Sequence, residues 1–196
     1  VSAVIGHGIV PAALEMIDAL SIKAVQNMTD LGYPEDAGAV LLIELEGLKE
    51  EVEEIGAEVE AALWETRATQ VKVAEEESER MALWAGRKGA LGALGSLAPN
   101  YYLIDGVVPR TQLAQVLRQV AGVSEKYGIQ IANVFHAGDG NLHPCLLFDE
   151  RQPGALDTII AAGAEVLRIC VDAGGSLTGE HGVGLEKKNQ MPLVFT

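Results

Sequence analysis

Two apolar segments joined by Asp139-Gly140 constrain the fold of this chain more than any other feature. Residues 129–135 and 142–148 are rich in branched and aromatic side chains, which is typical of strands. An Asp-Gly pair between two strands is a strong signal for a two-residue hairpin, because both central positions of that turn need positive φ. We therefore expect the two segments to be antiparallel neighbours, which disfavours a doubly wound parallel sheet.

Helical and strand-like periodicities are mixed along the rest of the chain. Helices are predicted at residues 10–26, 48–63, 75–94, 109–123 and 156–171, and further strands at 39–45, 69–73 and 101–108. This order predicts an α+β domain with a ferredoxin-like, largely antiparallel sheet and helices packed on one face. A chain of 196 residues is long enough for one substantial core.

Charge, hydropathy and cysteine content exclude several classes of protein. Fourteen Lys and Arg against 28 Asp and Glu give a net charge of −14, and such a surface repels nucleic-acid phosphates. The apolar runs are much shorter than the roughly 20 residues that a membrane span needs. Cys145 and Cys170 have apolar neighbours and form no CxxC motif. They are predicted to be buried free thiols in a reducing compartment.

Both ends of the sequence look cut. The chain begins at Val1, without an initiator Met and within an amphipathic pattern, and it ends on the apolar residues Leu193, Val194 and Phe195. We therefore expect residues 1–196 to be a piece of a longer polypeptide.

Three of the four histidines fall in two short segments, and the first segment holds His136 and His143. Fully extended, these two would lie about 23 Å apart at ~3.3 Å per residue. A two-residue loop at 139–140 would instead place them directly opposite each other, with Cβ atoms ~5 Å apart, within reach of one metal ion. The alternative is that both are hydrogen-bonded structural residues beside a turn formed by Asp139 and Asn141. His7 has no such neighbours and is expected to be an ordinary exposed residue.

The second segment, residues 174–184, contains five glycines in eleven positions. That density excludes a helix or an ordinary strand, and it usually reflects close backbone approach to a ligand or sharp turns around a site. The segment has no phosphate-binding or dinucleotide-binding glycine spacing. It presents Glu180 next to His181, and adjacent side chains in an extended loop point different ways. One could therefore bind a metal, as in a two-histidine, one-carboxylate site, while the other faces a substrate.

Arg87 follows the apolar residues of the helix predicted at 75–94. It is either a plain surface charge or a planar, two-pronged contact for the carboxylate of a small organic acid. Its spacing leaves both interpretations open.

Two motifs together resemble the C-terminal domain of FAD-linked 2-hydroxyacid oxidases and dehydrogenases. The motifs are His136-Ala-Gly-Asp-Gly-Asn-Leu-His143-Pro and, further on, Gly-Glu180-His181-Gly-Val-Gly. The Trp-x-x-Arg87-Lys element and the Tyr-Tyr-x-x-Asp105-Gly segment are also similar to that family, so the resemblance covers essentially the whole chain. Its members include glycolate oxidase subunits, cytochrome-linked D-lactate dehydrogenases and D-2-hydroxyglutarate dehydrogenases.

The resemblance implies a site and a reaction. His136, His143 and Glu180 would bind a divalent zinc, manganese or iron ion. His181 would be the base that takes the proton from the C2 hydroxyl, and Arg87 would hold the substrate carboxylate. The reaction would be oxidation of a small D-2-hydroxy acid, of the glycolate or D-lactate type, to the 2-oxo acid by hydride transfer to FAD.

The sequence departs from the family pattern in three places. The flavin-binding N-terminal half and the usual C-terminal tail are missing, and Leu103 stands where some relatives carry a Lys for a second substrate carboxylate. The resemblance therefore implies that residues 1–196 are a substrate and metal (cap) domain, inactive alone. FAD would be held mainly by the flavin-binding domain of the same polypeptide. Other implied partners are electron-transfer subunits, and the implied location is the cytoplasm or the periphery of the inner membrane. The alternative is a stand-alone α+β module that binds a metal or ligand without redox activity.

Overall fold

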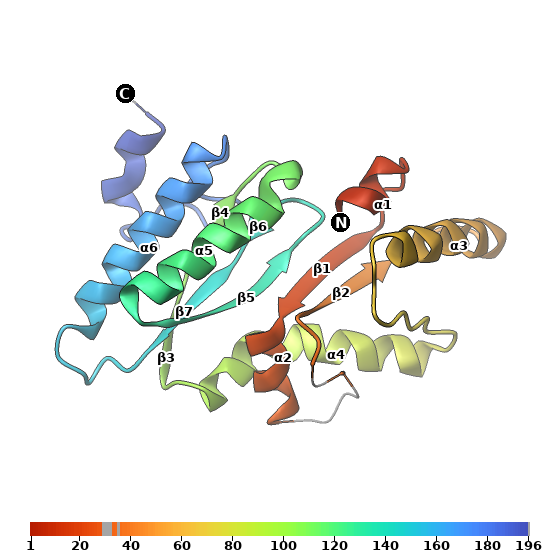
Figure 1. The fold of residues 1–196 in the computed structure, drawn as a ribbon, viewed down its shortest axis with the longest axis horizontal. Coiled ribbons are helices and arrows are strands. Elements are labelled where there is room, and N and C mark those ends of the chain that lie inside the picture. Colours follow the sequence, from red (N-terminus) through yellow and green to blue (C-terminus); the bar gives the residue numbers. More distant parts are fainter. Residues whose placement is uncertain (29–32, 35, 196) are drawn as a thin grey trace.

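The computed structural model describes residues 1–28, 33–34 and 36–195, and within them it contains an antiparallel sheet packed against helices (Figure 1). The strands are β1 Ala13–Asp18, β2 Ala39–Glu44, β3 Asn100–Leu103, β4 Gly106–Val107, β5 Gln130–His136, β6 Asn141–Leu142 and β7 Pro144–Phe148. The helices are α1 Ser2–Gly6, α2 Ala19–Gln26, α3 Lys49–Glu65, α4 Glu77–Ala93, α5 Leu113–Tyr127 and α6 Ala155–Asp172, with 3-10 turns at Leu94–Ser96, Arg110–Gln112 and Lys188–Leu193. The predicted α+β class with an antiparallel sheet is confirmed.

Strand β5 lies at the centre of the sheet. It pairs with β1 on one side and with β6 and β7 on the other, while β2 forms one edge and β3 and β4 form the other. The pairs β3–β7 and β4–β6 share one register, so they behave as two long strands with a common interruption. That register places Asp105 opposite His143 at the interruption, and both residues become important for the site.

Helices cover both faces of the sheet, so the prediction that they pack on one face is wrong. Phe135 and Leu146 belong to the core beneath α5 and α6, whereas Val134 and Cys145 belong to the core beneath α2 and α4. Successive residues of β5 and β7 therefore point into two different cores. A continuous apolar run such as that of β7 is the pattern expected of a strand buried on both faces.

Two local predictions are also corrected. Residues 10–26 are not one helix, because 13–18 form β1 between β2 and β5, and the sheet pairing outweighs the local helical pattern. The helix begins only at Ala19, where the Asp18 carboxylate accepts the N–H of Ser21 at 2.9 Å. Residues 69–73 form no strand and instead belong to the connection between α3 and α4.

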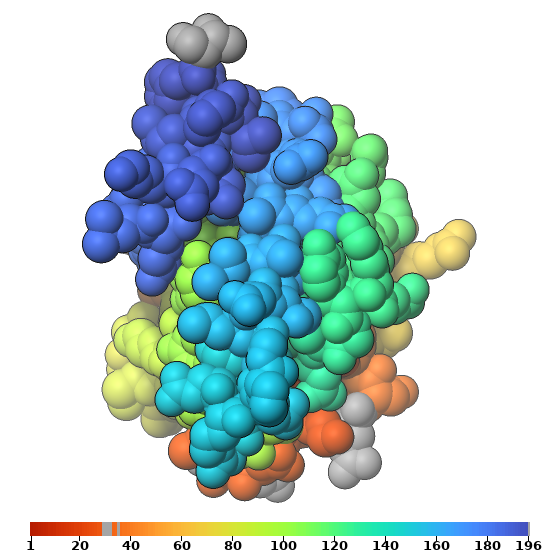
Figure 2. All heavy atoms as spheres, turned by 90° about the vertical axis from the view of Figure 1, so that its left-hand side faces the viewer, coloured from red at the N-terminus to blue at the C-terminus, as the bar shows by residue number. Residues whose placement is uncertain are grey.

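Figure 2 shows the face of the molecule that carries α6, with the C-terminal segment beside it and α5 at its other flank. The 3-10 turn at Lys188–Leu193 packs against α6. No helix in the described part of the chain is both long and apolar enough to cross a membrane.

Cys145 and Cys170 are free and fully buried, as predicted, one in each core. Burial raises the pKa of both thiols to about 12, so neither forms the reactive thiolate near neutral pH. We expect neither thiol to react with Ellman's reagent in the native chain at pH 8, and both to react once guanidinium unfolds it. Rapid reaction of either thiol before unfolding would contradict the structure.

Candidate metal centre

The hairpin that carries the two histidines has a longer loop than the sequence predicts. His136 pairs with Asn141 across β5 and β6, so residues 137–140 form a four-residue loop and His136 is not directly opposite His143. Of the two expected turn residues, Gly140 alone has positive φ, at 72°. The loop is held from outside, since the Gly138 N–H donates to the Leu14 carbonyl and the Val108 N–H to the Gly140 carbonyl, both at 2.9 Å.

The two histidines nevertheless meet on one face of the hairpin. His143 lies two residues beyond Asn141, so its side chain is on the same face and diagonal to His136. The ring centroids are 5.2 Å apart. The predicted proximity is therefore correct, although the predicted register is wrong.

The glycine-rich segment approaches the hairpin by running beside β4. The Ser176 N–H donates to the Val107 carbonyl at 2.9 Å, and the Val107 N–H donates back to the Ser176 carbonyl at 3.1 Å. A Cβ atom at Gly175 would lie 1.8 Å from the Val107 carbonyl oxygen, and one at Gly179 would lie 2.5 Å from the Asn141 side chain. These two glycines therefore allow the glycine-rich segment to lie close to Val107 and Asn141.

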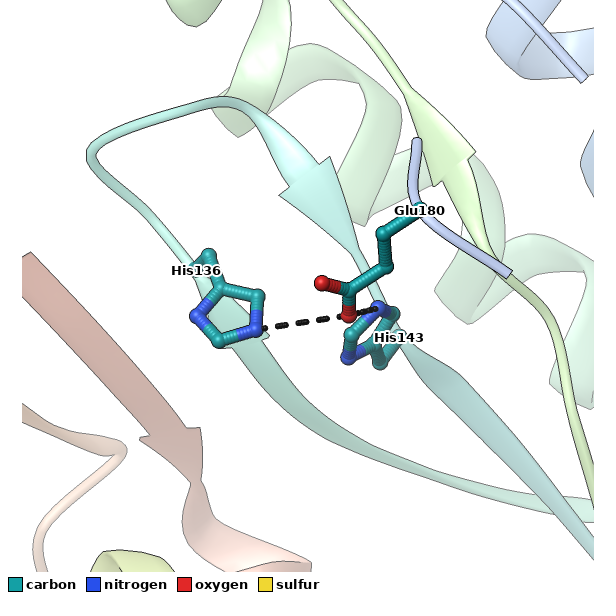
Figure 3. Close-up of side chains that lie close together, drawn as sticks. All are labelled: His136, His143 and Glu180. Carbon is teal, nitrogen blue, oxygen red and sulfur yellow. Dashed lines mark ion pairs between the residues drawn. The ribbon is translucent and has the colours of Figure 1, made fainter. Parts of the chain in front are cut away.

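Glu180 reaches back from this segment to the two histidines (Figure 3). Its Oε1 lies 3.1 Å from His143 Nε2 and 3.6 Å from His136 Nε2, and one possible ligand atom of each residue lies within 4.8 Å of those of the other two. Ligand atoms around a tetrahedral zinc ion lie about 3.3 Å apart, given metal–ligand distances of about 2.0–2.2 Å. The three groups expected from the sequence are thus together, at a spacing that fits a single ion.

His143 is buried, and its Nε2 faces a carboxylate oxygen of Glu180. The residue is 5% exposed, and Nε2 makes no hydrogen bond within the described residues, although Glu180 Oε1 faces it. Burial lowers the pKa of His143, and neighbouring His136 lowers it further, which favours the neutral imidazole. When the proton of this neutral ring is on Nδ1, Nε2 is an acceptor that faces a second acceptor, the Glu180 carboxylate oxygen, and a cation between the two would satisfy both.

His181 lies at the edge of this cluster. Its Nε2 is 3.4 Å from the same Glu180 Oε1, and its ring stacks on that of His143 with centroids 5.0 Å apart. Adjacent Glu180 and His181 therefore do not point apart, as the sequence argument expected, but converge. About half of the His181 side chain is exposed, so a small molecule can reach it from solvent.

Glu15 is a site residue that the sequence analysis missed. It lies opposite His136 in the β1–β5 register, and its Oε1 is 2.7 Å from His136 Nδ1. A carboxylate at Nδ1 holds the proton on that nitrogen and leaves Nε2 free for a metal. Glu15 was hidden because residues 10–26 were predicted to be a helix, and its pairing with His136 depends on sheet register.

Arg87 is not a plain surface charge, because its side chain is 11% exposed and pairs with Glu15. The Glu15 Oε2 atom accepts from Arg87 Nη2 at 2.7 Å and from Nε at 3.0 Å. Arg87 is therefore connected to His136 through one shared carboxylate. Nη1 takes no part in these two contacts.

Asp105 is a second missed residue, and it is fully buried beneath the glycine-rich segment. Burial raises the pKa of this carboxyl, but hydrogen bonds from the Thr178 hydroxyl and the His181 and Gly179 N–H groups, together with Lys187, outweigh that effect. The pKa is held well below its usual range, so Asp105 is an anion at neutral pH. His7, by contrast, is exposed at the end of α1, as expected.

Comparison with known proteins gives one family over the whole chain. Residues 1–196 match the family described as FAD linked oxidases, C-terminal domain. The glycolate oxidase subunit GlcD of Escherichia coli K12 is 47% identical over 192 residues, which cover 98% of this chain and 38% of that protein. GlcD of Bacillus subtilis is 39% identical over 184 residues, covering 94% of this chain and 39% of that protein. The mitochondrial D-lactate dehydrogenase [cytochrome] of Kluyveromyces lactis is 28% identical over 199 residues, covering 97% of this chain and 34% of that protein.

A solved structure shares the fold. The 4-ethylphenol oxidase from Gulosibacter chungangensis, in its isoeugenol complex, superimposes with a TM-score of 0.59 at 15% identity, covering 87% of this chain and 40% of that one. The present chain thus spans about two-fifths of the length of the relatives that it matches.

Proposed function

Because the chain belongs to the family of FAD-linked oxidase C-terminal domains, we propose that it binds the metal and substrate of an enzyme that oxidises a small D-2-hydroxy acid. The proposed substrate is of the glycolate or D-lactate type, and the product is the 2-oxo acid. The observation that carries this proposal is the convergence of His136 Nε2, His143 Nε2 and Glu180 Oε1. The names of the relatives support the choice of substrate class.

The proposed division of labour follows from the position of each side chain. His136, His143 and Glu180 would hold a divalent zinc, manganese or iron ion, which polarises a bound hydroxyl. His181 would take the hydroxyl proton at Nε2, because this nitrogen lies beside the ligands and about half of the side chain is exposed to solvent. As the C2–O bond becomes a carbonyl, the hydride leaves C2, and bound FAD supplies the acceptor.

Arg87 is the proposed contact for the substrate carboxylate. Glu15 fixes the guanidinium plane through Nε and Nη2, and a guanidinium held in this way can still donate from Nη1. The shared carboxylate keeps this group at a fixed place relative to His136. Orientation of the acid by Arg87 would bring its C2 hydroxyl toward the metal and His181.

The flavin-binding part is proposed to lie outside these 196 residues, in keeping with relatives more than twice as long. The domain alone would therefore hold half of an active site and show no turnover. We propose the flavin-binding domain of the same polypeptide as its partner, with electron-transfer subunits as further partners. The buried free thiols support a reducing compartment, and we propose the cytoplasm.

The full-length protein containing this domain provides the test. Its metal content is measured as purified, and glycolate, D-lactate, L-lactate and D-2-hydroxyglutarate are assayed with an artificial electron acceptor. We expect oxidation of glycolate or D-lactate, loss of activity on dialysis against a chelator, and recovery with Zn²⁺, Mn²⁺ or Fe²⁺. Activity that survives complete metal removal, or no oxidation of any 2-hydroxy acid, would reject the proposal.

Substitution Glu15→Gln tests the carboxylate that orients His136. An amide of the same size is a weaker acceptor for the proton on Nδ1, and in its other orientation it would donate to Nδ1 instead, so we expect Zn²⁺ affinity to fall about 10- to 100-fold. Competition with a chromophoric chelator measures that change. Glu44→Gln is the matched control, because Glu44 on β2 also pairs with an α4 arginine, Arg80, at 2.9 Å, but on the surface. Equal Zn²⁺ affinities for Glu15→Gln and Glu44→Gln would contradict this role.

A further inference from the structure

A buried ion pair lies directly behind the glycine-rich segment. Asp105 is fully buried and Lys187 is 5% exposed, and Lys187 Nζ donates to the Asp105 carboxylate at 3.1 Å and to its backbone carbonyl at 2.7 Å. Lys187 precedes the 3-10 turn that packs against α6, in the C-terminal segment visible in Figure 2. Buried ion pairs contribute little to stability on balance, since desolvation offsets most of the attraction. This pair therefore calls for another explanation.

The Asp105 carboxylate binds successive groups of the segment that carries Glu180 and His181. It accepts the N–H of Gly179 at 2.9 Å and of His181 at 3.0 Å, and the N–H of Glu180 lies 3.3 Å from both of its oxygens. Hydrogen bonds to a charged acceptor are about twice as strong as neutral ones. Fixing three consecutive peptide groups also fixes the directions of the side chains attached to them.

Thr178 extends the same network to the next turn. Its hydroxyl donates to Asp105 at 2.6 Å, and the same oxygen accepts the N–H of Gly182 at 2.8 Å. The residues on both sides of Glu180 and His181 are therefore tied to one carboxylate. An amide cannot replace that carboxylate, because its NH₂ group would face Gly179 N–H in one orientation and His181 N–H in the other.

The same carboxylate also approaches the hairpin. Asp105 lies opposite His143 where both long strands are interrupted, and its Oδ1 is 3.7 Å from His143 Nε2. Asp105 thus sits between the element that supplies the imidazoles and the element that supplies Glu180. Lys187 balances its charge, so the anion does not add a second uncompensated negative charge beside Glu180.

We propose that Asp105, neutralised by Lys187, is a positioning residue that clamps residues 178–182 and so holds Glu180 and His181 against the two histidines before a metal binds. The predicted effect on metal affinity rests on the proposed function. The predicted effect on segment order does not, because each hydrogen bond of Asp105 joins it to a group of the protein.

The experiment uses the full-length protein with four variants: Asp105→Asn, Lys187→Met, their double variant and Asp18→Asn. Amide hydrogen exchange of residues 178–182 is measured in the metal-free protein, Zn²⁺ affinity by chelator competition, and stability by thermal unfolding. Asp18→Asn is the matched control, since Asp18 also accepts backbone N–H groups, from Ser21 and Asn133, but caps α2. The double variant removes the unpaired buried lysine that Asp105→Asn alone leaves, so it keeps the test valid if that single variant unfolds.

We expect exchange at 178–182 to rise about 10- to 100-fold in Asp105→Asn and in the double variant, as loss of charge-assisted hydrogen bonds implies. Zn²⁺ affinity should fall about 10- to 100-fold in the same two variants. The double variant should recover the thermal stability that Asp105→Asn loses, without recovering slow exchange. Asp18→Asn should lose thermal stability and leave both other measurements unchanged.

Wild-type exchange rates at 178–182 in the double variant would overturn the inference. So would an equal acceleration of this segment in Asp18→Asn, which would reduce Asp105 to a general contributor to stability. If the wild-type protein binds none of Zn²⁺, Mn²⁺ and Fe²⁺, the proposed metal function fails, and the exchange rates alone decide the role of Asp105.

Discussion

Replacing His143 with alanine is expected to remove both the bound metal and the turnover of the full-length enzyme. His143 is the most buried of the three proposed ligands, and its Nε2 lies 3.1 Å from Glu180 Oε1. With His136 and Glu180 alone, the site has too few ligands to retain zinc, which in catalytic sites has three protein ligands. A metal that polarises the hydroxyl stabilises the transition state by several kcal/mol. Without it, kcat/KM should fall by about 10³-fold or more.

Metal content and turnover of His143→Ala are measured on the same preparation, and circular dichroism verifies the fold. His7→Ala is the matched control, because His7 is exposed at the end of α1 and has no part in the cluster. It should match the wild-type protein in both measurements. Full metal content together with full activity in His143→Ala would show that this imidazole is a structural residue.

The second large effect is expected for His181→Ala, which should lose turnover while keeping the metal. His181 lies outside the three-atom cluster, so its removal leaves all three ligands in place. General base catalysis contributes typically 10²- to 10⁴-fold, and we expect kcat to fall by about that amount. The variant should also lose the limb of the kcat pH profile that reports the base.

The two variants separate a ligand from a base. Metal analysis of His181→Ala should give the wild-type stoichiometry, in contrast to His143→Ala. If His181→Ala also loses the metal, His181 is a ligand and another group must accept the proton. Unchanged kcat would exclude His181 from the reaction altogether.

The sequence predicted the members of the cluster better than the geometry that assembles it. His136 and His143 were placed opposite each other by a two-residue turn, and the actual four-residue loop makes them diagonal. The predicted proximity of the two histidines was still correct, because side chains two residues apart on a strand share a face. A register error of two residues therefore leaves both imidazoles on the same side of the sheet. An error of one residue would have separated them.

Glu15 and Asp105 escaped prediction because their roles depend on contacts between distant segments. Glu15 meets His136 only through the β1–β5 pairing, and Asp105 meets the glycine-rich segment more than 70 residues further along. A single sequence carries no local pattern for such pairings. The covering of both sheet faces did have a signal, in the continuous apolar run of residues 144–148, although the ferredoxin-like order of the predicted elements favoured helices on one face.

The role of Arg87 was predicted only in part. The sequence left open a surface charge or a carboxylate contact, and the structure shows a partly buried guanidinium with a carboxylate partner within the chain. The arginine side chain had indicated that a carboxylate could be bound. Its actual partner, Glu15, could not be predicted, because that contact depends on how α4 packs against the sheet. The proposed substrate contact adds a second carboxylate to the same group.

Anomalous scattering from crystals of the active full-length enzyme shows where the bound metal lies. Data collected above and below the absorption edge of that metal locate it by its own scattering. We expect one peak within bonding distance of His136 Nε2, His143 Nε2 and a Glu180 oxygen, at about 2.0–2.2 Å if the ion is zinc. An active enzyme whose metal lies elsewhere, or whose three side chains surround no metal, would rule out the proposed metal site.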